Sequence, residues 1–266
     1  FATGTYAVTN GAVTLDNGTS PAVATVGIRE AETTRATLAV LLNGAGGLTK
    51  LGPGHLDLTA ATPGALDGPL TVKAGTLTST ATNGAPFGAG PVLLTGGTLE
   101  AMPAGGGLDV ELALASGHAT NTFAYGAGAS TFRFTKGANT SLTLTLGNAG
   151  AGDGSVLARA DNGVLIVAPT NGISPANLGA AERLLVNGGV PTRNGMADAA
   201  IAGRDNDTMD SGGFLTYDGT NGVVAASYTN GLGGGAGSLA DIIADTATSS
   251  AQVYALRVSG KTLTVN

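Results

Sequence analysis

The chain has 266 residues, of which 45 are glycine and only 11% are charged, and its formal net charge is −6. The 12 Lys and Arg residues are scattered singly, so the sequence offers no basic patch for a nucleic acid or an acidic membrane surface. No run of about 18 apolar residues occurs, which excludes a membrane-spanning helix. Cysteine is absent, which excludes disulfides and thiolate chemistry.

Short β-prone runs follow one another along nearly the whole chain. They alternate apolar and polar residues, and short turn-forming segments such as Asn43-Gly44 and Asn221-Gly222 join them. The sequence therefore predicts an all-β fold. The expected strands lie at 6–9, 12–15, 22–28, 37–42, 56–58, 70–73, 92–95, 108–114, 131–135, 141–146, 156–158, 164–167, 184–186, 214–217, 223–227, 254–258 and 262–265.

Residues 47–101 contain three versions of one pattern, and this repeat predicts the architecture. The versions are GLTKLGPGHLDL, GPLTVKAGTLTS and GPVLLTGGTLEA, and they place Leu56, Leu77 and Leu99 at equivalent positions. A unit of this size cannot bury its apolar face alone and must stack on its neighbours. The repeat predicts a right-handed parallel β-helix, or β-solenoid, in which one turn, or rung, takes roughly 21–22 residues.

The Asn-Gly pairs leave a second interpretation open. Both residues tolerate positive φ, so each pair could close an antiparallel hairpin of a sandwich or a barrel. The repeat favours the solenoid, because equivalent residues recur one rung apart rather than two strands apart. About ten to twelve rungs, at roughly 4.8 Å each, would form a rod of about 50 to 60 Å.

Three segments break the regular pattern, near 174–183, 191–210 and 231–240. In the first, Ser174 is a candidate N-cap and Pro175 a candidate first helical residue, which predicts one or two helical turns. The second is polar and is expected to be a surface loop or short helix, and the third a flexible connection. Strand-like runs resume after each, so we expect a single domain over 1–266.

The residues offer little catalytic chemistry. His55 and His118 lie far apart in the sequence, and no triad or metal-ligating arrangement accompanies either of them. The densest acidic cluster is Asp205, Asp207 and Asp210, for which solvated loop acids are a simpler interpretation than a Ca²⁺ site. We therefore expect no enzyme, no cofactor and no metal site.

The alternative to a non-enzymatic protein is a carbohydrate-active β-helix, either a polysaccharide lyase or a glycosidase, that uses the acidic loop 198–218. It would require Asp205, Asp207 and Asp210 to converge in a groove with basic or aromatic side chains. The candidates for those side chains are Arg193, Arg204 and Tyr217.

The run GGLTKLGPGHLDL, followed by GPLTVKAGTL and GAGPVLLTGGTLEA, resembles the passenger-associated transport repeat of autotransporter passengers over residues 46–101. The segments 212–228 and 253–266 are similar to non-repeat parts of such large secreted bacterial proteins. His55 departs from the pattern, which usually has Thr there, and 59–67 replaces an aromatic-containing turn. The resemblance implies a right-handed parallel β-helix that is extracellular or displayed on the bacterial outer surface.

These features together predict a structural or adhesive surface protein. The first and last strands lack an evident polar cap, so the terminal rungs are expected to bind other copies head to tail in a fibre, or to continue into a longer passenger. Tyr6 and Val8 at one end and Leu263 and Val265 at the other are the expected self-association residues. Surface glycans or a neighbouring cell surface are further expected partners.

Overall fold

The computed structural model describes residues 5–15, 24–27, 34–60, 64–117, 123–151, 156–169, 173, 177–204, 212–258 and 260–265, with the backbone alone for 24–27. Within these residues the protein is all-β and contains no helix. This confirms the predicted fold class at the level of all-β. The strands are β1 (Thr5–Thr14), β2 (Ala24–Gly27), β3 (Arg35–Asn43), β4 (Leu48–Leu51), β5 (His55–Leu58), β6 (Leu70–Val72), β7 (Thr76–Ser79), β8 (Val92–Leu94), β9 (Thr98–Ala101), β10 (Asp109–Leu114), β11 (Phe123–Tyr125), β12 (Ala129–Phe134), β13 (Ser141–Leu146), β14 (Leu157–Arg159), β15 (Val164–Pro169), β16 (Glu182–Val186), β17 (Ile201–Arg204), β18 (Gly212–Asp218), β19 (Gly222–Ala225), β20 (Thr229–Asn230), β21 (Leu239–Ile242), β22 (Thr246–Thr248), β23 (Ala255–Val258) and β24 (Leu263–Val265).

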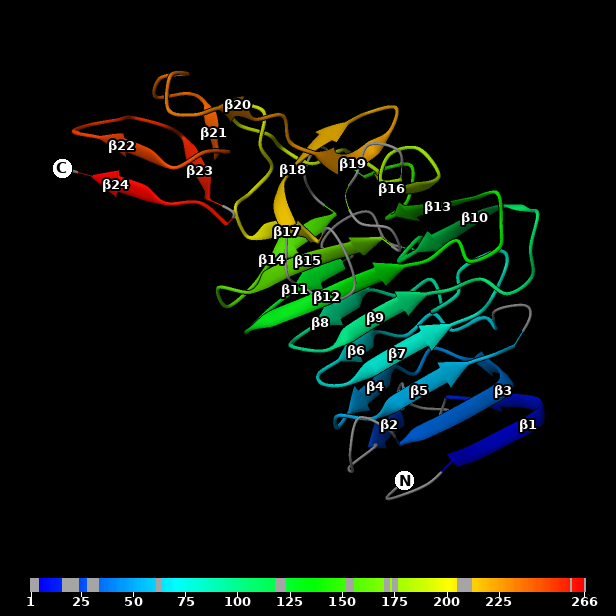
Figure 1. Cartoon of the computed structure of the whole chain (residues 1–266). Coiled ribbons are helices and arrows are strands. Elements are labelled where there is room, and N and C mark those ends of the chain that lie inside the picture. Colours follow the sequence, from blue (N-terminus) through cyan, green and yellow to red (C-terminus); the bar gives the residue numbers. More distant parts are fainter. Residues whose placement is uncertain are drawn as a thin grey trace.

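Most strands pair in parallel with strands one repeat away, and they form the stack seen in Figure 1. A ten-stranded sheet begins with β1, β3, β5, β7, β9, β12, β15 and β17 in that order, all paired in parallel, and continues into β18 and β19. A second sheet contains β2, β4, β6, β8, β11 and β14, and a third, shorter sheet contains β10, β13 and β16. We call the parallel strands of these three sheets together the main ladder.

The register of the main ladder follows the sequence repeat. Leu56 pairs with Leu77, and Leu77 pairs with Leu99, so the repeat seen in the sequence is the register of the sheet. The repeat then lengthens, since Thr98 pairs with Thr131, much further along the chain. Each later repeat includes an additional strand of the third sheet, which explains the greater length. The prediction that every repeat has the same length is therefore wrong beyond Ala101.

Aliphatic and aromatic side chains fill the inside of the main ladder. Leu56, Leu77 and Leu99 are fully buried, and Phe132 continues their column in the same register. Phe123 from the second sheet lies across the interior with its ring centroid 5.2 Å from that of Phe132. The alternation of inward and outward residues that sequence analysis relied on thus generates one continuous core.

An antiparallel segment ends the main ladder. β18 pairs antiparallel with both β17 and β19, and β19 lies against β16. The turn from β18 to β19 consists of residues 219–221, between the paired residues Asp218 and Gly222, and Gly222 has a φ of +81°. An Asn-Gly pair thus stands at an antiparallel hairpin, although it does not form a two-residue turn, so the expectation that every strand is parallel is wrong here. The hairpin also covers the end of the third sheet.

Parallel pairing resumes after the hairpin with a repeat shorter than that of the main ladder. Leu239 pairs with Ala255, and Thr246 pairs with Leu263. The order of strands is β20, β21, β23 in one sheet and β22, β24 in the other. We call these two sheets the C-terminal ladder, and Figure 1 shows that they project beside the end of the main ladder.

The structure corrects two of the three irregular segments. Residues 177–181 form turns and β16 begins at Glu182, so the helix expected over 174–183 does not form in the described part of that range, and 174–176 lie outside it. The loop expected over 191–210 contains strand β17, whereas 205–210 lie outside the described residues. The connection expected over 231–240 consists of turns that lead into β21.

Candidate functional site: the open ends of the ladders

The N-terminal end of the main ladder is one candidate surface. Among the described residues, β1 pairs only with β3, so its other edge has no hydrogen-bonded neighbour. Val8 pairs with Leu38 and is 42% exposed, and Val13 pairs with the buried Leu42 but is itself exposed. The apolar columns of the core therefore reach solvent at this end.

The C-terminal ladder ends in the same way. In the described residues, β23 pairs only with β21, and β24 only with β22. Leu256 and Val258 are 37% and 43% exposed, whereas their paired residues one repeat earlier, Ala240 and Ile242, are 0% and 1% exposed. Because in-register parallel strands place paired residues on the same face, the exposure marks a face that another strand pair would cover.

The four self-association residues expected from the sequence lie at these two ends. Tyr6 is half-buried and packs against the core beside the exposed Val8. At the other end Leu263 is half-buried and Val265 is 69% exposed. Within one molecule the two pairs are far apart (Figure 1), so they can meet only between copies. Leu256 and Val258 were not predicted as self-association residues, although ALRV alternates visibly in the sequence, because their partner strand β21 was not predicted.

A small cluster of side chains attaches the C-terminal ladder to the hairpin. Arg257 Nη2 donates to Asp241 Oδ2 at 2.6 Å, and the Arg257 guanidinium lies 4.0 Å from the centroid of the Tyr228 ring. The backbone N–H of Phe214 on β18 donates to the Tyr228 hydroxyl at 2.6 Å. The hydrogen bond from Arg257 lowers the pKa of Asp241. We call Asp241, Arg257, Tyr228 and Phe214 the clasp, since they connect β21 and β23 to β18.

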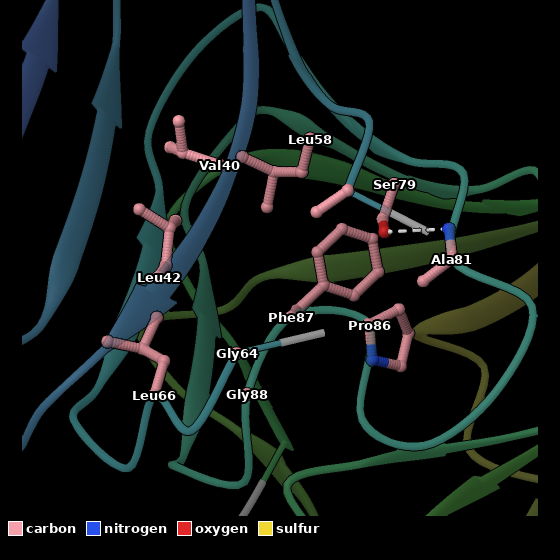
Figure 2. Close-up of a pocket in the computed structure, with 11 residues that line it drawn as sticks. Val40, Leu42, Leu58, Gly64, Leu66, Ser79, Ala81, Pro86, Phe87 and Gly88 are labelled. Carbon is pink, nitrogen blue, oxygen red and sulfur yellow. Dashed lines mark hydrogen bonds between the residues drawn. The ribbon is translucent and has the colours of Figure 1, made fainter. Parts of the chain in front are cut away.

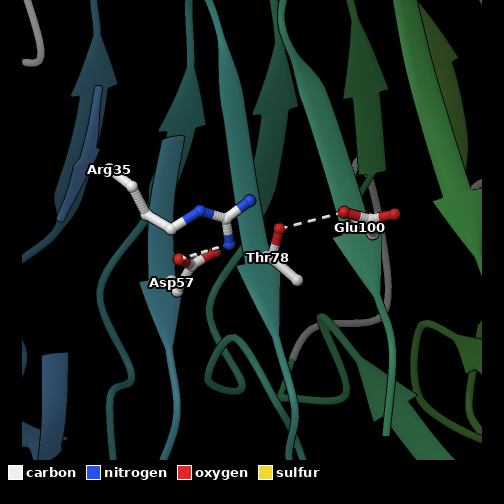
Figure 3. A network of polar contacts seen from close by, with 4 residues as sticks. All are labelled: Arg35, Asp57, Thr78 and Glu100. Carbon is white, nitrogen blue, oxygen red and sulfur yellow. Dashed lines mark hydrogen bonds and ion pairs between the residues drawn. The ribbon is translucent and has the colours of Figure 1, made fainter. Parts of the chain in front are cut away.

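The outer face of the main ladder carries a column of polar side chains (Figure 3). Each carboxylate in this column contacts a neighbouring arginine. Asp57, Thr78 and Glu100 occupy equivalent positions in three successive strands. Arg35 Nη1 donates to Asp57 Oδ2 at 2.7 Å, and the Thr78 hydroxyl donates to Glu100 Oε2 at 3.0 Å. Arg133 Nη1 lies 3.6 Å from Glu100 Oε1. These carboxylates are thus held in contacts along the sheet rather than aimed into a cleft.

Lys50 is a fully buried lysine inside the main ladder. It occupies the position of Val72 and Leu94 in the two following repeats. Its ammonium donates to three backbone carbonyls, those of Leu51 at 3.0 Å, Gly52 at 2.7 Å and Ala74 at 3.0 Å. Burial lowers the pKa of Lys50 to about 8. The ammonium thus satisfies carbonyls at the corners of two adjacent repeats, which is a structural role.

An apolar recess lies beside the first sheet (Figure 2). Its lining includes Val40, Leu58, Leu66, Phe87 and Ala81, and its cavity volume is about 30 Å³. That volume holds roughly two water molecules. Ligand pockets are usually about ten times larger. The recess is therefore a packing void rather than a substrate site.

The acidic loop on which the enzyme alternative depends is described only in part. Asp205, Asp207 and Asp210 lie outside the described residues. Asp198 Oδ1 accepts from the N–H of Ala200 at 2.7 Å, and Asp218 Oδ1 accepts from that of Thr220 at 2.7 Å. These bonds stabilise local turns, and the bond from Thr220, together with those from Asn221, lowers the pKa of Asp218.

Two of the side chains expected to join the acids, those of Tyr217 and Arg193, contact other groups. The Tyr217 hydroxyl donates to the Val186 carbonyl at 2.9 Å, and the Arg193 guanidinium lies 5.9 Å from the Tyr254 ring centroid. Arg204 is buried. His55 is half-buried on the outer face of β5, whereas His118 lies outside the described residues. In the described part of the chain, no three His, Asp or Glu side chains gather in a way that could hold a metal ion.

Comparisons with known proteins add no relative. No family model matches the chain, and no curated protein or solved structure matches it significantly. Among the described residues, no helix is long and apolar enough to cross a membrane. The resemblance to autotransporter passenger repeats stays a prediction.

Proposed function

We propose that this chain is a non-enzymatic structural protein, a segment of a parallel β-solenoid rod that associates end to end through its terminal repeats. The observation that carries the proposal is the exposure of apolar core columns at strand edges that have no neighbour in the described residues, at β1 and again at β23 and β24. Apolar columns and unpaired backbone groups together favour the addition of further β-strands.

The register of the main ladder supports the solenoid part of this proposal. Strands of alternate sheets follow one another along the chain and pair one repeat away, as expected if the chain winds around a common core. The polar column of Asp57, Thr78 and Glu100 adds hydrogen bonds along the outside of the main ladder. Such a body is stiff along its axis, which suits a spacer, a fibre or an adhesive stalk.

Sedimentation velocity at rising protein concentration tests this proposal. End-to-end association predicts species larger than the monomer, with a frictional ratio that increases as the particles lengthen. Because burial of apolar surface drives the contact, moderate salt should not dissolve it. A monomer at every concentration up to the millimolar range would contradict the proposed assembly.

A location on the outer bacterial surface, or outside the cell, is part of the proposal and is supported by the resemblance of residues 46–101 to passenger repeats. Surface glycans or a neighbouring cell surface would be the partners of the outer faces. Labelling of intact producing cells with an antibody against the chain tests the location. Signal that requires permeabilised cells would contradict it.

A further inference from the structure

A tight turn formed by Asn194 and Gly195 lies next to the C-terminal ladder. The backbone N–H of Arg193 donates to the carbonyl of Met196 at 2.7 Å, and the N–H of Met196 donates to the carbonyl of Arg193 at 3.0 Å. Asn194 and Gly195 have φ values of +52° and +76°, the positive pair that a type I′ turn requires. Both residues are exposed, and a Cβ built on Gly195 would meet nothing within 4 Å. The turn is thus anchored at its base and open at its tip.

This turn leaves a thermolabile amide free to react. The backbone nitrogen of a residue can attack the side-chain amide of a preceding asparagine, and glycine offers the least hindrance because it has no Cβ. Within the described part of the chain, neither the Asn194 amide nor the Gly195 N–H forms a hydrogen bond. At Asn43-Gly44 both groups are occupied, since Asn43 Oδ1 accepts from the Ala65 N–H at 2.8 Å and the Gly44 N–H donates to the Ala65 carbonyl at 2.9 Å.

The other described Asn-Gly pairs fall into two groups. In the first, a hydrogen bond holds the Asn amide or the Gly N–H, as at Asn162, Asn187, Asn221 and Asn230. In the second, Asn10 within β1 and Asn83 between β7 and β8 are exposed, but they belong to the main ladder. Asn194 therefore combines an unheld amide with a place beside the C-terminal ladder.

The turn also positions a residue of the small core that joins the two ladders. Met196 is 6% exposed and packs in one cluster with Leu239 of β21. The Asn194 amide faces the segment before β21, since a Cβ built on Gly237 would lie 3.9 Å from Asn194 Cγ. A change in the length of the turn would therefore act on the attachment of the C-terminal ladder.

We propose that Asn194 is a site of spontaneous modification that loosens the C-terminal ladder. The Gly195 nitrogen attacks Asn194 Cγ, the Cγ–Nδ2 bond breaks, and the Gly195 amide proton leaves with Nδ2 as ammonia. Water then opens the resulting succinimide ring. Cleavage at Cγ gives aspartate, and cleavage at the backbone carbonyl carbon gives isoaspartate.

The isoaspartate product carries the structural consequence. It adds a methylene group to the main chain, so the turn can no longer close with both hydrogen bonds between Arg193 and Met196. Met196 then loses its fixed place against Leu239. This inference does not depend on the proposed end-to-end association.

Peptide mapping by mass spectrometry tests the site. Trypsin releases residues 194–204, in which Asn194 is the single asparagine, and residues 36–50, in which Asn43 is the single asparagine. After incubation of the whole chain in mildly alkaline buffer, aspartate and isoaspartate should accumulate at Asn194 at least ~10-fold faster than at Asn43, because Asn43-Gly44 must first open its hydrogen bonds. Equal rates in the two peptides, or no isoaspartate in 194–204, would overturn the inference.

Hydrogen exchange on the incubated protein tests the consequence. Asn194→Gly keeps a residue that suits the turn and removes the amide, so it is the matched unreactive variant. Amide protection in β21 and β23 is expected to fall about tenfold in the converted wild type and to stay unchanged in Asn194→Gly after the same incubation. Unchanged protection in the converted wild type, or an equal loss in Asn194→Gly, overturns the inference and leaves the proposed function standing.

Discussion

Lys50 shows how one residue can depart from a repeat and still be accommodated inside it. Val72 and Leu94 occupy its position in the next repeats, and a charged group in such a column would ordinarily be costly. The three carbonyls around its ammonium offset part of that cost. The same crowded corner explains Gly75, which has a φ of +66° and where a Cβ would overlap the carbonyl oxygens of Gly54 and Gly52 and lie 2.7 Å from Lys50 Nζ.

The lowered pKa of Lys50 predicts how stability depends on pH. Between about 8 and the unfolded value of 10.5, the folded chain has released the proton and the unfolded chain still holds it. Raising the pH through this window therefore favours the folded state, by ~2 kcal/mol between pH 7.5 and 9.5. Urea unfolding at these two pH values measures the difference.

Two variants isolate the contribution of Lys50. Lys50→Met removes the titrating group, so the gain in unfolding free energy between pH 7.5 and 9.5 should be smaller by the same ~2 kcal/mol. Lys73→Met changes an exposed lysine one residue after β6 and should retain the wild-type pH dependence. Equal pH dependence in wild type and Lys50→Met would show that Lys50 titrates normally.

Leu77 tests the core column directly. It is fully buried between Leu56 and Leu99, so Leu77→Ala should lower the free energy of unfolding by about 3 to 5 kcal/mol through lost burial and an unfilled cavity. Thr76→Ala, on the outward side of the same strand, should cost less than about 1 kcal/mol. Similar losses for the two variants would contradict the assignment of inward and outward faces.

At the scale of elements, the sequence predicted strands well where alternation was long and poorly where strands were short. The runs 6–9 and 12–15 merge into one strand, because the Asn10-Gly11 pair is accommodated as a register shift within β1 rather than as a turn. Strands such as β17 and β20 are too short for a period to be recognised.

The clasp predicts that the C-terminal ladder can loosen independently of the main ladder. Arg257→Met removes the ion pair with Asp241 and the contact with the Tyr228 ring. Amide protection in β21 and β23 should then fall about tenfold, whereas protection in β5, β7 and β9 should not change. Hydrogen exchange followed by mass spectrometry resolves these segments.

Arg257→Lys is the matched variant for the clasp. Lysine keeps the charge but cannot stack a planar guanidinium over Tyr228, so an intermediate loss of protection is expected. Uniform loss across the main ladder in Arg257→Met would mean that the two ladders unfold as one unit and that the clasp does not separate them.

At the scale of the whole molecule, the repeat in residues 47–101 was sufficient to predict all-β structure and parallel register there. It could not predict the longer repeats after Ala101, because no change in amino-acid composition marks the additional strands β10, β13 and β16. The antiparallel hairpin could not be predicted either, since an Asn-Gly pair suits both a hairpin turn and a bend between parallel strands. With eight parallel strands in the first sheet, the described part of the main ladder rises only ~34 Å, shorter than the rod expected from the sequence.

The exposure of the residues in the terminal strands was partly predictable from the sequence. Val8 and Val265 are exposed, as expected of unpaired end strands, whereas their role in self-association stays a prediction. Leu256 and Val258 required the structure, because only the pairing of β21 with β23 shows that these positions are normally covered. The two open ends are properties of the whole molecule rather than of any motif.

Electron microscopy of the purified chain at rising concentration is the most direct test of association through the open ends. The account predicts particles joined at their ends, with paired particles about twice as long as single ones and no wider. Single short particles at every concentration, or particles joined side by side, would contradict the claim that the ladder ends are the binding surfaces.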